Sequence, residues 1–172
     1  LITVDAYWYA GKKNPLGDRL AEIVAALPSV GKVVVADLCG DAATVAANLP
    51  NGTTLEAYIA PFEAGEPTFE RLPFDHPVYI LFSSGTTGVP KCIVHRAGGV
   101  LLQHLKEHAL HADVHAGDRL FYFTTLGWMM WNWLASGLAT GATLLLYDGS
   151  PFHPGPAVLL DYAEKERMTH FG

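Results

Sequence analysis

The stretch Val78–His95, VYILFSSGTTGVPKCIVH, decides how this chain is interpreted. An apolar run typical of a β-strand, Val78–Phe82, stops abruptly and gives way to small and hydroxylated residues. Pro90 and Lys91 follow, and a second short apolar run comes directly after them. The pattern predicts a strand, a loop over Ser83–Pro90 and a second strand that begins at Lys91.

The composition of this loop suits the binding of phosphate groups. It offers hydroxyl groups, two glycines that let the backbone approach a ligand, and one positive charge: Ser83, Ser84, Gly85, Thr86, Thr87, Gly88 and Lys91. Amides of the turn that point inward would add donors to an anion. A Walker A motif is excluded, because Pro90 precedes Lys91 and a β-like run follows it, where that motif opens a helix. A polar turn between two strands that binds nothing is the alternative.

Residues Ile80–Lys91 match, without a gap, a signature of adenylate-forming enzymes: an apolar strand and then Ser/Thr-Ser/Thr-Gly-Ser/Thr-Thr-Gly-x-Pro-Lys. The chain therefore resembles that superfamily, which includes acyl-CoA synthetases, luciferases and the adenylation domains of peptide synthetases. The resemblance implies that Lys91 and the loop hydroxyls hold the β- and γ-phosphates of ATP, with Mg²⁺ bridging them, while a carboxylate oxygen attacks the α-phosphorus. All seven loop residues named above are thus predicted to bind the ATP phosphates.

A second motif lies in the aromatic run Phe121–Trp133, FYFTTLGWMMWNW. Gly127 and Trp128 stand where a predicted strand ends and a helix begins, which is where open α/β sheets bind ligands. The similarity to acyl-CoA synthetases implies that this pair lies near the acyl pocket and the pantetheine tunnel, although core packing explains Trp128 equally well. Acetate-activating synthetases continue with Trp-x-Thr-Gly, with the Thr close to CoA, whereas this chain has Met130 and Trp131 at the Thr and Gly positions.

Four further segments narrow the resemblance to the acetoacetate-activating branch of the acyl-CoA synthetases: KCIVHRAGGVLLQHLKEHALH, GDRLFYFTT, GWMMWNWL and GATLLLYDGSPFHP. The likeness is strong over Thr68–Gly172 and weaker before it. It implies that acetoacetate, ATP and CoA become acetoacetyl-CoA, AMP and pyrophosphate through an acyl-adenylate. Two alternatives stay open: an adenylate-forming enzyme for another short acid such as acetate or propionate, and a non-catalytic nucleotide-binding domain with the same fold.

Composition and charge narrow the class of protein. Of the 172 residues, 50% are hydrophobic and 16% charged, which suits a segment covered by more protein. The net charge of −6 without a Lys/Arg cluster argues against nucleic acid or an anionic membrane as partner. Cys39 and Cys92 form no metal or redox motif, so a cytoplasmic location fits best. The longest apolar stretch, Trp128–Leu146, is interrupted by polar residues and glycines, which argues against a membrane span.

Helical and strand-like patterns alternate and predict a layered α/β fold with a mainly parallel sheet flanked by helices. We expect a single partial domain over 1–172, with an α/β segment at 1–60, a connecting loop at 61–77 and the phosphate-loop and acyl-pocket segment at 78–172. The chain begins at Leu1 without Met and stops at what resembles the opening of a strand. A fragment of a large N-terminal domain is therefore expected, whose partner is the remainder of the same enzyme chain.

Histidines form a third pattern, at spacings of four, three and four: His104, His108, His111 and His115. Pairs at i and i+4 on a helix can bind Zn²⁺, but a polar helix face beside Lys106 and Glu107 is the simpler interpretation. No metal ligand is assigned. No catalytic residue is assigned either, because the catalytic lysine of the resembling family lies in a later, mobile domain, so this chain by itself is expected to lack ligase activity.

Overall fold

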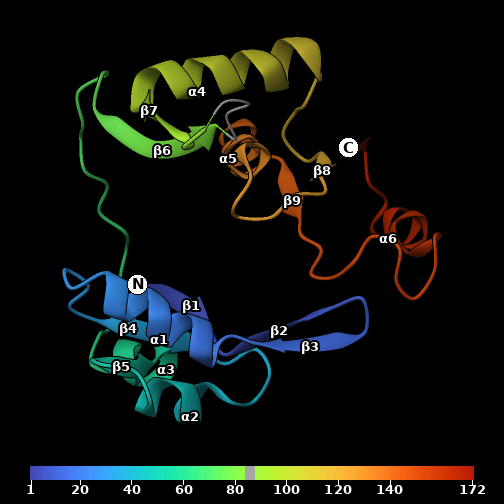
Figure 1. Ribbon diagram of the computed structural model, residues 1–172. Helices are drawn as coiled ribbons and strands as arrows, with labels where there is room; N and C mark the ends of the chain where they lie inside the picture. The colour runs from blue at the N-terminus through green and yellow to red at the C-terminus, as the bar shows by residue number, and fades with distance from the viewer. Residues whose placement is uncertain (84–87) are drawn as a thin grey trace. The chain divides into compact units, whose positions relative to one another are not determined.

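The computed structural model describes residues 1–83 and 88–172, and the chain divides into two compact units (Figure 1). Unit 1 consists of Leu1–Pro67 and Asp148–Pro156, and unit 2 of Thr68–Tyr147 and Ala157–Gly172. The predicted single partial domain, with segments at 1–60, 61–77 and 78–172, stays a prediction. No helix within the described residues is both long enough and apolar enough to cross a membrane.

Unit 1 is built on a three-stranded parallel sheet of order β1-β4-β5. Its strands are β1 (Ile2–Val4), β4 (Val33–Ala36) and β5 (Gly52–Thr54). Its helices are α1 (Gly17–Ala26), α2 (Ala42–Ala47) and α3 (Leu55–Ile59). An antiparallel hairpin, β2 (Ala6–Tyr9) and β3 (Lys12–Pro15), leads from β1 to α1. The order of strands and helices is the βαβ arrangement that the alternating pattern predicts.

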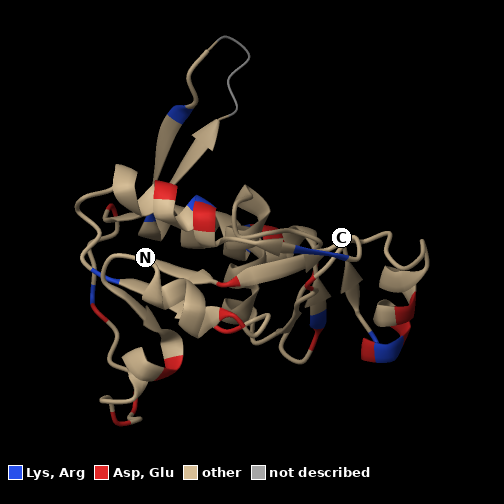
Figure 2. Ribbon diagram, turned by 60° about the horizontal axis from the view of Figure 1, so that its bottom comes forward, with Lys and Arg blue, Asp and Glu red and all other residues tan. Residues whose placement is uncertain are grey.

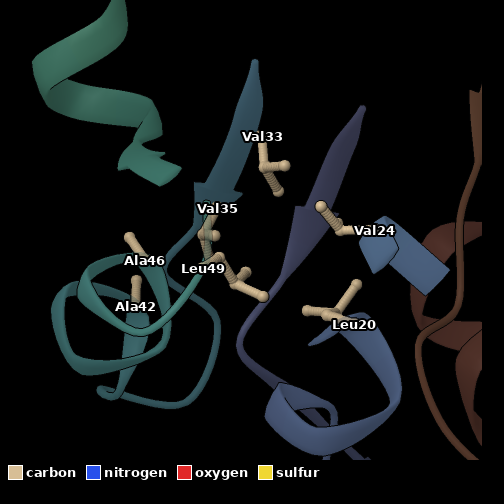
Figure 3. Close-up of a cluster of buried hydrophobic side chains, with 7 residues drawn as sticks. All are labelled: Leu20, Val24, Val33, Val35, Ala42, Ala46 and Leu49. Carbon is tan, nitrogen blue, oxygen red and sulfur yellow. The ribbon is translucent and has the colours of Figure 1, made fainter. Parts of the chain in front are cut away.

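The core of unit 1 forms between α1, the middle strand and α2. Seven buried side chains meet there: Leu20, Val24, Val33, Val35, Ala42, Ala46 and Leu49 (Figure 3). Val33 and Val35 are 0% exposed on one face of β4, and Val34 is 3% exposed on the other. Because both faces of this middle strand are covered, its sequence is apolar throughout rather than alternating. Leu20 and Val24, four residues apart, form the buried face of α1.

Unit 2 combines a second parallel sheet with an antiparallel hairpin. The sheet has the order β10-β8-β9, with strands β8 (Arg119–Phe121), β9 (Thr143–Leu145) and β10 (His170–Phe171). The hairpin consists of β6 (Pro77–Ser83) and β7 (Lys91–Arg96). The helices are α4 (Ala97–Lys106), α5 (Met129–Ser136) and α6 (Val158–Glu166). A π-helical turn, Glu107–His111, extends α4, and a 3₁₀ turn, Gly137–Thr140, extends α5.

A small core joins α5 to the sheet of unit 2. Its buried members are Val114, Leu120, Leu134 and Ala142. Gly137 allows the close approach, because a Cβ there would lie 2.8 Å from Cδ2 of Leu120. Gly141, with φ +83°, ends the 3₁₀ turn in the left-handed conformation that glycine adopts without strain.

The predicted α/β fold with parallel sheets is confirmed, but the parallel strands belong to two separate sheets. The β2–β3 hairpin was not predicted, since β3 is polar and carries no apolar alternation. The sequence also suggests that Met129 lies in the core together with Trp133 and Leu134. That expectation is wrong for Met129, which is 52% exposed, and right for Leu134, which is 1% exposed.

Candidate functional site

The β6–β7 hairpin positions the two ends of the predicted phosphate loop. Its antiparallel register places Ser83, the last residue of β6, opposite Lys91, the first residue of β7. The backbone is therefore paired across the two strands as far as Ser83 and Lys91. Four predicted ligands of the phosphates, Ser84, Gly85, Thr86 and Thr87, lie outside the described residues, and their contacts stay predictions.

Lys91 presents a cation at the open end of the hairpin. Its side chain is exposed, and within residues 1–83 and 88–172 no ion pair or hydrogen bond engages its ammonium group. Strand β6 contains no charged residue, whereas β7 begins with Lys91 and ends with Arg96; Figure 2 colours the Lys and Arg residues of the chain blue. Gly88 has φ +144°, and apart from its chain neighbours no described residue places an atom within 4 Å of where its Cβ would lie. A cation that has no partner among the described residues can meet an anion without first breaking a contact to any of them.

Gly127 and Trp128 lie in the turn that leads from β8 into α5. Trp128 is the N-cap of α5, and its backbone N–H donates to the carbonyl of Thr125 at 3.1 Å. Its side chain is 70% exposed, so Trp128 does not belong to the core that the described residues of unit 2 form. Trp131, in contrast, is half-buried and packs against the core of unit 2. The role of Gly127 and Trp128 near an acyl group stays a prediction.

A cleft of about 720 Å³ opens between β7, α4 and α5, and the sequence did not predict it. Its lining is mostly apolar with a few polar groups: Val94, His95, Arg96, Gly99, Val100, Gln103, His104, Glu107, Tyr122, Met129, Met130 and Trp133. A largely apolar cleft with a few convergent polar groups is typical of a small-molecule site. Met129 and Met130 directly follow Trp128, so the cleft continues the segment that the resemblance places beside the acyl group. Helix α4, which lies against β7 in Figure 1, supplies the opposite wall.

Two histidines of the α4 region are buried, against the expectation of a polar face. His104 is 8% exposed and borders the cleft, and His108 is 0% exposed. Nε2 of His108 lies 2.9 Å from the carbonyl oxygen of Trp133 and 3.0 Å from the hydroxyl of Ser136. Since a carbonyl can only accept, the Nε2–H of His108 donates to Trp133 and ties the π-helical turn to α5. The Nδ1 atoms of both histidines are buried without a partner among the described residues.

Burial lowers the pKa of both rings, because an apolar environment disfavours the imidazolium. For His104, burial is the main cause, the nearby rings of His108 and His95 lower the pKa further, and Glu107 opposes them. For His108, burial again dominates, while the carbonyl of Trp133 and the carboxylate of Glu107 oppose it. Both imidazoles are therefore neutral at neutral pH, and each has one N–H donor.

Histidine spacing does not assemble a metal site in the described part of the chain. No group of three or more His, Cys, Asp or Glu side chains suited to a metal ion occurs there. His111 and His115 are exposed, unlike His104 and His108. His115 instead lies 3.7 Å from the carboxylate of Asp113.

Comparison with known proteins identifies relatives of this chain. The model of the AMP-binding enzyme family matches residues 5–172. The chain is 58% identical over 171 residues to acetoacetyl-coenzyme A synthetase of Rhizobium meliloti (strain 1021), a match that covers 99% of this chain and 26% of the relative. It is 47% identical over 165 residues to malonamoyl-CoA synthetase vrtB of Penicillium aethiopicum, covering 91% of this chain and 22% of the relative.

A solved structure agrees with these matches. Acetoacetyl-CoA synthetase from Streptomyces lividans superimposes with a TM-score of 0.90 at 46% identity, covering 100% of this chain and 26% of that protein. The chain thus spans about a quarter of the length of the relatives it matches.

Proposed function

The chain belongs to the AMP-binding enzyme family, and on this premise we propose that it is part of an ATP-dependent acid–thiol ligase that activates acetoacetate. A carboxylate oxygen of the acid attacks the α-phosphorus of ATP, and pyrophosphate leaves. The sulfur of CoA then attacks the carbonyl carbon of the acyl-adenylate, AMP leaves, and the thiol proton is released. The products are acetoacetyl-CoA, AMP and pyrophosphate.

The placement of Ser83 opposite Lys91 carries the nucleotide part of this proposal. The ammonium of Lys91 attracts the terminal phosphates and holds the leaving pyrophosphate in line with the attacking oxygen. Mg²⁺, when bound with ATP, spreads the charge of the phosphates, and the hydroxyl of Ser83 is an oxygen donor of the kind that this ion accepts. Together with Ser84, Gly85, Thr86, Thr87 and Gly88, these residues are proposed to surround the phosphates.

The choice of acetoacetate as the acid substrate rests on the names of the relatives. Acetoacetyl and malonamoyl groups both carry a carbonyl at the third carbon, beyond the carboxyl group that becomes the thioester. We therefore assign the acyl group to the cleft beside Gly127 and Trp128, where Met129 and Met130 provide an apolar wall. A cytoplasmic location is proposed with this activity, because Cys39 and Cys92 are both free thiols, as is usual in a reducing compartment.

Exchange of labelled pyrophosphate into ATP tests the proposal in the protein encoded by the open reading frame that carries these residues. Acetoacetate should support the fastest exchange, ahead of acetate and propionate. Preference for acetate or propionate would instead identify a synthetase for another short acid. ATP binding without exchange for any acid would indicate a non-catalytic nucleotide-binding domain.

The variant Lys91→Ala tests the nucleotide site separately. It should weaken ATP binding by about tenfold or more, because one charge-assisted contact to phosphate is lost. Lys165→Ala is the matched control, since Lys165 is an exposed lysine of α6. Equal effects of the two substitutions on ATP affinity would contradict a phosphate role for Lys91.

A further inference from the structure

His104 is a polar side chain of the cleft that has no hydrogen-bond partner among the described residues. His104 is more than nine-tenths buried, it borders the cleft, and no described residue hydrogen-bonds to either of its ring nitrogens. Buried polar groups in proteins are almost always hydrogen-bonded, because an unmade bond leaves the desolvation of the group uncompensated. A buried ring that borders an open cleft without a partner therefore points to a partner that the cleft admits.

His108, one helical turn further on, shows what a structural histidine looks like in this place. Its Nε2–H is used by the carbonyl of Trp133, so the ring joins two helical segments. His104 forms no such link, although it lies on the same side of the helix. The two neighbours thus differ in function: His108 holds α5, whereas the donor of His104 is available.

Burial also indicates which nitrogen of His104 meets a ligand. Nδ1 is shut off from solvent and has no partner among the described residues. An unpaired acceptor is tolerated better in a protein interior than an unpaired N–H, so the proton belongs on Nε2. The group available to the cleft is then an N–H donor, and its natural partner is a carbonyl oxygen.

Building on the proposed function, we propose that His104 is a specificity-determining residue that donates a hydrogen bond to the carbonyl oxygen at the third carbon of the acyl substrate. The carboxylate end of the acid must stay free to attack ATP, so only the distal carbonyl can reach a donor inside the cleft. Met129, Met130 and Trp133 line the same cleft and surround the rest of the short chain. The substrate class is therefore short acids with a carbonyl at the third carbon, which includes acetoacetate and malonamate.

A hydrogen bond from His104 should discriminate against acids that lack the carbonyl oxygen at the third carbon. Butyrate has the carbon skeleton of acetoacetate, but it offers no oxygen at the third carbon to the N–H of His104, a residue that is only 8% exposed. A site built around a hydrogen bond discriminates in this way through the cost of the unpaired group. Removing the donor should cost about 10- to 100-fold in kcat/KM for acids with the distal carbonyl.

The experiment compares acetoacetate, malonamate and butyrate as substrates, using acid-dependent pyrophosphate release by the protein from the complete open reading frame. His104→Leu removes the donor, and His104→Gln places an amide N–H near the position of Nε2. His111→Leu is the matched control, because His111 is exposed at the end of the same helical segment. We expect His104→Leu to lower kcat/KM for acetoacetate and malonamate while butyrate stays near its wild-type value. His104→Gln should recover much of the loss.

Other outcomes would overturn the inference. If all three acids lose the same factor in the Leu and Gln variants, His104 has a structural role; if none changes, it has no role in selection. A wild-type protein that does not prefer acetoacetate to butyrate would overturn the proposed function and this inference with it.

If the Leu variant does not fold, ¹⁵N-histidine spectra of the wild-type protein test the contact instead. Acetoacetate should shift the Nε2 signal of His104 and butyrate should not. Equal shifts with both acids, or no shift with either, would refute the contact.

Discussion

Strand β4 of unit 1 and strand β6 of unit 2 have equally apolar sequences and opposite environments. Val33 and Val35 of β4 are 0% exposed beneath α1 and α2. Ile80 and Phe82 of β6 are 54% and 67% exposed, although they stand in an uninterrupted apolar run. An apolar run thus identifies a strand, whereas the burial of that strand depends on which elements cover it. The proposed phosphate site stands on the less covered of the two regions.

This contrast predicts the largest effects of substitution. Val35→Asp places a carboxylate in the closed core of unit 1 and should cost about 3 kcal/mol or more of unfolding free energy, since a buried charge has no partner there. Phe82→Asp is the matched change on the hairpin and should leave the urea midpoint almost unchanged, because the side chain is already in solvent. Similar losses in urea unfolding for both variants would show that β6 is buried like β4.

A second prediction concerns Asp5, which secures unit 1 at the end of β1. Its carboxylate is 1% exposed and accepts the backbone N–H groups of Leu38 at 2.9 Å, Cys39 at 3.1 Å and Asp41 at 2.8 Å. Burial tends to raise its pKa, but these bonds outweigh burial and lower the pKa to about 2. Asp5→Asn should therefore cost of the order of 1–2 kcal/mol at neutral pH.

The sign of the pH dependence follows from the lowered pKa of Asp5. Stabilisation by the carboxylate is complete above the unfolded value near 4 and is lost as the pH falls through about 2. Thermal melts from pH 7 to pH 2 measure it, with the exposed Asp18→Asn as control. A melting temperature of Asp5→Asn that stays below wild type by the same interval even at pH 2 would contradict the assigned role.

Unit 2 should respond to acid at a higher pH than unit 1. The lowered pKa of His104 and His108 means that the unfolded chain takes up their protons first, as the pH falls below about 6.5. The neutral rings therefore stabilise the fold fully above about pH 6.5 and less at lower pH. His95 lowers the pKa of His104 further, and Glu107 opposes the lowering. Hydrogen exchange at pH 5 and pH 7.5 should show faster opening of α4 and α5 at the lower pH, while β4 stays protected. His111→Gln should leave this response intact, and uniform loss of protection in both units would refute the difference.

The smallest effect is expected at the ion pair that supports the loop held by Asp5. Nζ of Lys13 lies 2.5 Å from the carboxylate of Asp41, and both side chains are partly exposed. The pair raises the pKa of Lys13, chiefly through the hydrogen bond to Asp41. Exposed ion pairs contribute little and are screened by salt, so Lys13→Ala should lower stability less than Asp5→Asn does. In 1 M NaCl, Lys13→Ala and the wild-type protein should be equally stable. A loss in Lys13→Ala that persists at that salt concentration would indicate packing rather than charge.

Much of the local structure could be predicted because it depends on local patterns. Leu20 and Val24 recur at helical spacing, which predicts α1, and the run Val33–Ala36 is typical of a buried parallel strand, which predicts β4. The Ser83–Pro90 segment separates two apolar runs, which predicts the two strands of the β6–β7 hairpin. The β2–β3 hairpin escaped prediction, because only AYWY has strand-favouring residues, whereas its partner KKNP is polar and contains a proline. The histidine pattern was misinterpreted for a related reason: spacing shows that His104 and His108 share a face but not that α5 covers it.

Periodicity and one contiguous motif were enough to predict the class of fold, the position of the candidate phosphate loop and the family. The three-dimensional arrangement was needed to find that Trp128 is exposed, that Met129 and His104 border one cleft, and that Ser83 lies opposite Lys91. The physical reason is that burial and hydrogen bonding arise between segments far apart in the chain. His108 and Trp133 are joined by a bond that spans 25 residues, and no local pattern encodes such a partner.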